Sequence, residues 1–144
     1  MMRASGSEIA VTVGLLCAIG LVLIARIFAD RRELLLYGIG LGVTAIEYIV
    51  LGLLRGAPAG YLGRELMGAI LFGIAALLGS RRWPLLLALG WTAHVVWDLF
   101  FHEIGSGFAP AWLPWFCVGF DLFIGGYIAG LIRVTPQGSA PWSH

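Results

Sequence analysis

The sequence predicts an all-α integral membrane protein, folded as a bundle of about five transmembrane helices. Of its 144 residues, 60% are hydrophobic and only 12% are charged, and the mean hydropathy is +0.93. A soluble domain of this length could not remove that much apolar surface from water. The apolar residues also gather in segments of the roughly 17–25 residues that cross a bilayer core. The 21 glycines often fall inside these segments, where they favour close contact between helices.

Five apolar segments account for the predicted helices. They are residues 9–28, 34–54, 61–78, 83–104 and 112–132. The first segment is too long, and its basic flank too weak, for a cleaved signal peptide. Pro84 suits the first turn of the fourth helix. We therefore expect one transmembrane helical domain over residues 1–133 and a disordered cytoplasmic tail over residues 134–144.

Arginine placement predicts the orientation of the bundle. All the basic residues are arginines, and most fall on the side of the membrane that holds the C-terminus. The larger group is Arg26, Arg31, Arg32, Arg81, Arg82 and Arg133, and the smaller is Arg3, Arg55 and Arg64. Because cytoplasmic loops carry the excess of basic residues, we expect the N-terminus outside and the C-terminus in the cytoplasm. No basic tract indicates nucleic-acid binding.

Three ionisable residues follow one face of the fourth predicted helix. His94, Asp98 and His102 are spaced four apart, which places them on the same side of a helix. Ionisable groups within hydrocarbon are costly and therefore usually mark a functional site. At about 1.5 Å per residue, the three lie about 15, 9 and 3 Å from the outer end of the span.

Three acids on other predicted helices lie at similar depths. Glu47 is about 10 Å, Glu65 about 6 Å and Asp121 about 15 Å from the outer end of its own span. All six side chains therefore fall in the outer half of the membrane. The simplest arrangement is a single pocket, open to the outer side, to which four helices contribute. The alternative is that each of the six is a hydrogen-bonded packing residue.

Two imidazoles and up to four carboxylates are ligands suited to a divalent metal, with Zn or Fe favoured and Mn also accommodated. His94 and His102 lie about 12 Å apart along the helix axis, so one ion can hardly bind both. Two ligand sets remain open. The deep set is His94, Asp98 and Asp121, and the shallow set is His102, Asp98 and Glu65.

The chemistry that such a site favours is hydrolysis of a lipid or other apolar substrate that enters from the outer leaflet. Asp98, His102 and Glu65 are the predicted catalytic residues, because a carboxylate or imidazole beside a metal-bound water can take its proton. An oxygen-using iron site fits the same ligands. The residues predicted to line the substrate pocket are Trp91, Trp97, Phe101 and Glu47.

The same sequence is also compatible with other functions. The same residues can form an ion or proton path, a metal-free acid–base site for an isomerase or cyclase, or a polar face for a partner subunit. The oligomeric state is also open. Cys17 and Cys117 both lie in apolar segments and are predicted to be packing residues rather than a disulfide pair. Cys117 precedes Asp121 by one helical turn, so it can face the same pocket.

The residues around these positions resemble an uncharacterised family of small bacterial integral membrane proteins. The resemblance rests on LALGWTAHVVWDLFFH, on GRELMGAI before it and on CVGFDLFIGGYIAG after it. These segments carry a His-x-x-Trp-Asp-x-x-x-His signature, an upstream Glu and a following Asp, and the match covers about residues 61–132. The resemblance implies a bacterial inner-membrane location. It selects Glu65, His94, Trp97, Asp98, His102 and Asp121.

Overall fold

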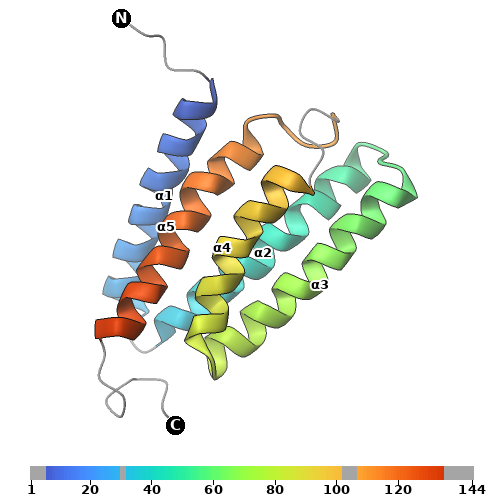
Figure 1. Ribbon diagram of the computed structural model, residues 1–144. Helices are drawn as coiled ribbons and strands as arrows, with labels where there is room; N and C mark the ends of the chain where they lie inside the picture. Colours follow the sequence, from blue (N-terminus) through green and yellow to red (C-terminus); the bar gives the residue numbers. More distant parts are fainter. Residues whose placement is uncertain (1–5, 30–31, 102–106, 135–144) are drawn as a thin grey trace, which may run out of the picture.

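The structure of the protein is a computed structural model that describes residues 6–29, 32–101 and 107–134. These residues form five α-helices and no β-strand, which confirms the predicted all-α class (Figure 1). The helices are α1 (Gly6–Phe28), α2 (Glu33–Leu54), α3 (Ala59–Arg81), α4 (Pro84–Phe100) and α5 (Leu113–Val134).

Four of the helices are long and apolar enough to cross a membrane, namely α1, α2, α3 and α5. The fourth helix in the chain, α4, is shorter at 17 residues, or about 25 Å. It starts at Pro84, as expected, but it ends at Phe100, short of the predicted end at residue 104. Residues 102–106 and the predicted tail from residue 135 lie outside the described residues.

The helices run alternately up and down the bundle (Figure 1). The last helix, α5, lies between α1 and α4, and α3 packs against both α2 and α4. The C-terminal halves of α2 and α4 therefore share one end of the bundle with the N-terminal halves of α3 and α5. The predicted polar residues of these helices thus lie toward one end, as their depths suggested. The direction of insertion stays a prediction.

Glycines allow α1 and α5 to cross very closely. A Cβ atom on Gly14 of α1 would collide with the backbone carbonyl of Phe116, and one on Gly119 of α5 would collide with the carbonyl of Val11. Small residues at such a crossing let two backbones touch, which is a common way for membrane helices to associate. The pair therefore fixes where α5 lies against the rest of the bundle.

A polar network joins three helices at the other end of the bundle. The Tyr37 and Tyr127 hydroxyls both donate to Glu33 Oε1, at 2.8 and 2.7 Å. The Arg26 guanidinium donates to the Tyr127 hydroxyl at 2.6 Å and lies 3.9 Å from the same Glu33 oxygen. These contacts tie α1, α2 and α5 together and satisfy the half-buried Glu33 carboxylate.

The glycine crossing predicts a position-specific effect within α5. Gly119→Ala should destabilise the protein by about 1–3 kcal/mol, because the added methyl group forces α1 and α5 apart. Gly126→Ala is the matched control, since a Cβ atom there meets nothing within 4 Å. Thermal unfolding in detergent measures both. Equal midpoints for the two variants would contradict the close crossing.

Candidate metal centre

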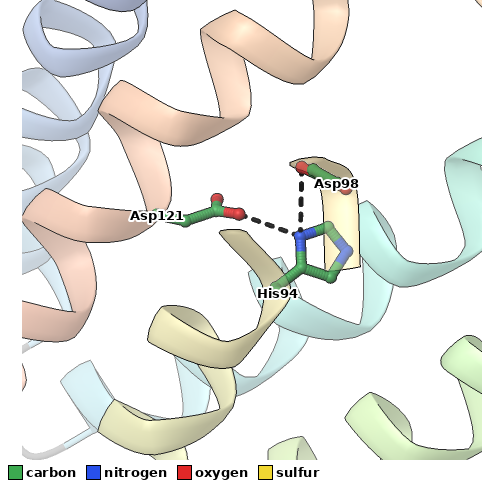
Figure 2. A group of neighbouring side chains, drawn as sticks. All are labelled: His94, Asp98 and Asp121. Carbon is green, nitrogen blue, oxygen red and sulfur yellow. Dashed lines mark hydrogen bonds and ion pairs between the residues drawn. The ribbon is translucent and has the colours of Figure 1, made fainter. Parts of the chain in front are cut away.

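Three ionisable side chains meet in the interior of the bundle, where α4 faces α5. They are His94 and Asp98 of α4 and Asp121 of α5 (Figure 2). One ligand atom from each residue lies within 4.8 Å of the other two. The side chains are 1%, 0% and 0% exposed, so the cluster is shielded from solvent and lipid alike. We call these three residues the His–Asp–Asp cluster.

Local sequence and helix packing together build this cluster. The spacing of four residues places His94 and Asp98 on one face of α4. On α5, Gly125 follows Asp121 by one turn and permits the close approach of α4. A Cβ atom on Gly125 would stand 2.7 Å from the Thr92 hydroxyl. The missing side chain thus lets Asp121 reach across to the imidazole.

The imidazole of His94 turns one nitrogen toward both carboxylates. Its Nδ1 atom lies 2.8 Å from Asp121 Oδ2 and 3.6 Å from Asp98 Oδ2. The other ring nitrogen points away from both (Figure 2). A proton on Nδ1 can be donated to Asp121 at the shorter distance. The same proton cannot also satisfy Asp98 at 3.6 Å, so the two carboxylates compete for one donor.

The two carboxylates keep oxygens that have no hydrogen-bond partner. Both oxygens of Asp98 and the Oδ1 atom of Asp121 are buried and unsatisfied among the described residues. Burying such atoms without compensation is strongly unfavourable. Two ionised carboxylates beside one imidazole also leave a net negative charge, even when the imidazole is protonated. A cation between the three side chains would remove both penalties.

The donor set fits a divalent transition metal. One imidazole nitrogen and two carboxylate oxygens are ligands that Zn, Fe and Mn accept. Three protein ligands leave a coordination position open, as in catalytic zinc sites. The structure thus brings together the deep ligand set, and the predicted metal site is confirmed as a group of residues that could hold an ion.

The other predicted ligands do not join this cluster. Glu65 is buried on α3, where its Oε2 atom accepts a hydrogen bond from Trp97 Nε1 at 3.3 Å. The Phe72 ring packs edge-on against both the His94 and the Trp97 rings. Glu65 is therefore not part of the His–Asp–Asp cluster, and its predicted role as a ligand or catalytic residue stays a prediction. His102 lies outside the described residues, so its part in a shallow ligand set stays a prediction.

The residues predicted to line one substrate pocket lie in three different places. Trp97 and Phe101 stack at 4.9 Å and line a groove between α3 and α4. Glu47 lines a second groove, beside α2 and the start of α5. Trp91 is fully buried against Phe120 and lines neither groove. The four side chains thus do not line one groove among the described residues, because Glu47 of α2 and the aromatic residues in and after α4 face different neighbours.

Cys117 was predicted to be a packing residue, and in the structure it also contacts ionisable residues in and beside the cluster. Both cysteines are free, and Cys117 is buried on α5 while Cys17 is exposed on α1. The Cys117 thiol donates to Glu47 Oε1 at 3.6 Å and also interacts with the Asp98 carboxylate. The one-turn spacing between Cys117 and Asp121 was the signal in the sequence, since it places both on one face of α5.

No family model, curated protein or solved structure matches this chain. The resemblance based on the His-x-x-Trp-Asp signature accordingly stays a prediction.

The cluster predicts unequal roles for its two aspartates in the metal-free protein. Asp121→Asn should destabilise the protein by about 1.5–3 kcal/mol, because it removes a charge-assisted hydrogen bond to His94. Asp98→Asn should change stability by less than about 1 kcal/mol, because it removes a buried charge that lies 3.6 Å from the imidazole, beyond hydrogen-bond distance. Thermal unfolding in detergent with excess chelator compares the two. A larger loss for Asp98→Asn would contradict the observed pairing.

Proposed function

We propose that the protein is a membrane metalloenzyme that binds one divalent ion at the His–Asp–Asp cluster and hydrolyses a lipid or other apolar substrate. One observation carries the proposal. One imidazole nitrogen and the carboxylates of two aspartates gather inside an apolar helical bundle, and three of the four carboxylate oxygens have no hydrogen-bond partner among the described residues. The bundle has helices suited to a bilayer, so a substrate that reaches this site is expected to come from the lipid phase.

The spacing of the donor atoms supports metal binding. Ligands that hold Zn at about 2.0–2.2 Å in a tetrahedron stand about 3.4 Å from one another. The distances from His94 Nδ1 to the two aspartate oxygens, 2.8 and 3.6 Å, lie on either side of that value. Small rotations of the side chains would therefore admit an ion held by His94 Nδ1 and one oxygen each of Asp98 and Asp121.

A bound divalent metal would supply a water whose pKa is lowered to about 7, which is a nucleophile at neutral pH. The protein's own residues define the rest of the reaction. Asp98 would keep a second oxygen near the open side of the cluster and can accept the proton of the attacking water. Phe72 packs on the imidazole of His94 and holds its ring plane. The buried surroundings exclude bulk water, which strengthens these electrostatic contacts.

Metal analysis of the purified protein tests the site. The wild type should carry about one equivalent of Zn or Fe, measured by mass spectrometry of the metal, and His94→Ala should carry less than about a tenth of that. Glu33→Gln, which removes an acid from the opposite end of the bundle, is the control and should retain the metal. A folded wild type without stoichiometric metal would overturn the site.

Glu65→Gln distinguishes the two predicted ligand sets in the same assay. The Glu65 carboxylate is engaged by Trp97, so we expect this variant to keep the metal content of the wild type. Loss of metal in Glu65→Gln with retention in Asp121→Asn would instead favour the shallow set.

Hydrolysis is tested with a chromogenic decanoate ester presented in detergent micelles. Turnover should disappear when the metal is removed with a chelator and return when Zn is added back. Asp98→Asn should lower the rate by about 100-fold or more, the usual cost of losing a general base. Turnover that persists after complete metal removal would reject metal-dependent hydrolysis.

A metal-free acid–base site is the second candidate, because the 2.8 Å contact between His94 and Asp121 needs no ion. Activity that survives chelation would select it. Ion transport has less support. Fully buried Leu41, Leu87 and Ile124 lie along the helices between the cluster and the Arg26–Glu33–Tyr127 network, and apolar side chains there oppose the passage of an ion.

A further inference from the structure

A groove of about 540 Å³ opens on the side of the bundle, between α2 and the segment that leads into α5. Its apolar walls include Val43, Ile46 and Val50 of α2 and Pro110, Trp112 and Leu113 of the opposite segment. The outward side chains are substantially exposed, with Val43 at 60% and Ile46 at 52%. In a bilayer this surface would meet lipid chains, so the groove offers an entrance from the hydrocarbon phase.

Among the described residues of the groove lining, Glu47 is the one that carries a charge. It is half-buried and lies within the span of α2, seven residues before the helix ends at Leu54. That position corresponds to a depth of about 10 Å below the end of the helix. A carboxylate at such depth in an otherwise apolar groove is costly unless it has a function.

A short chain of contacts leads from the groove to the His–Asp–Asp cluster. Glu47 Oε1 accepts a hydrogen bond from the Cys117 thiol, and that thiol also interacts with the Asp98 carboxylate. Glu47 also interacts electrostatically with both Asp98 and His94. The groove thus ends beside the cluster, with Cys117 as the contact between them.

The charge of this region selects the kind of molecule that can enter. Among the described residues, Glu47 is the charged residue of the groove lining, and no basic residue lines it. A phosphate or carboxylate headgroup would be repelled by the Glu47 carboxylate. A hydroxyl or amino headgroup would instead donate a hydrogen bond to Glu47, which is strong when one partner is charged.

We propose that this groove is the lateral substrate entrance, and that it binds a long-chain aliphatic ester or amide whose polar end carries a hydroxyl or amino group. The chain lies along the apolar wall of α2, and the headgroup is bound by Glu47 next to Cys117. This assignment rests on the proposed function, because the lipid is the substrate that the metal site would act on.

The groove between α3 and α4 is the rival entrance, with a volume of about 450 Å³. Among the described residues its lining contains no charged side chain, and Trp97 and Phe101 form part of its wall. The Phe72 ring, which also lines it, packs edge-on against the His94 ring. The described lining therefore offers no charged partner for a headgroup.

Photolabelling of the full-length protein in lipid nanodiscs tests the proposal. The probe is octadecylamine that carries a diazirine and an alkyne on its chain, and the competitors are unlabelled octadecanol, octadecylamine and octadecanoate. We expect labelled peptides from residues 43–51 and 110–113. The amine should compete at least about tenfold better than the carboxylate of the same length. Glu47→Gln should reduce that preference to about twofold or less.

Two tryptophan substitutions on α2 separate the groove from the general lipid surface. Ile46→Trp fills the groove and should lower labelling by about tenfold. Leu53→Trp is the matched control, because Leu53 is exposed on the same helix but does not line the groove, and it should label as the wild type does. Equal competition by octadecanoate, or unchanged labelling of Ile46→Trp, would overturn the proposal.

Metal content of the same preparations keeps the two proposals distinct. Both tryptophan variants should carry the metal content of the wild type, since neither residue touches the cluster. Selective labelling of a protein that binds no metal would overturn the proposed function alone. Stoichiometric metal without selective labelling would overturn the groove assignment alone.

Discussion

One imidazole that lies between two buried carboxylates imposes the main constraint on this structure. Water cannot compensate the charges of His94, Asp98 and Asp121, because all three side chains are almost completely buried. The single contact at 2.8 Å satisfies Asp121 in part, whereas the nearer Asp98 oxygen lies 3.6 Å from the same nitrogen. Isolated charges in a low-dielectric interior are neutralised by protons, partner charges or metal ions. A divalent ion bound among the three side chains would compensate both carboxylates, because His94, Asp98 and Asp121 each offer it a ligand atom.

The position of α5 determines whether this cluster exists. Asp121 comes from α5, whereas His94 and Asp98 come from α4, so the carboxylate reaches the imidazole only if the two helices pack closely. Gly125 permits that approach on the side of α4, and Gly119 permits the crossing with α1 on the other side. Small residues on two faces of one helix thus hold it between two neighbours. The glycines have a structural role, yet the geometry of the site depends on them.

Buried polar groups have different kinds of partners at the two ends of the bundle. At one end, the Glu33 carboxylate accepts hydrogen bonds from two tyrosines and lies near Arg26, so its charge is compensated within the protein. At the other end, Asp98 and Asp121 share one imidazole nitrogen, and Glu47 lines an open apolar groove. A fully satisfied network is typical of structural support, and a deficient one beside a groove is typical of a binding site. This difference favours the end of the bundle that holds the cluster as the site of function.

The sequence by itself determined the membrane class, the five helices and the placement of His94 and Asp98 on one face of α4. These properties are local, since they follow from composition, segment length and a spacing of four residues. Packing decided which way each helix is turned. Asp121 faces His94, Glu65 faces Trp97, and Cys117 faces Glu47. Hydrophobic pattern could not predict these rotations, because in a membrane both the lipid-facing and the interior surfaces of a helix are apolar. The close contacts at Gly119 and Gly125 help to orient α5, and these depend on neighbours that are distant in the sequence.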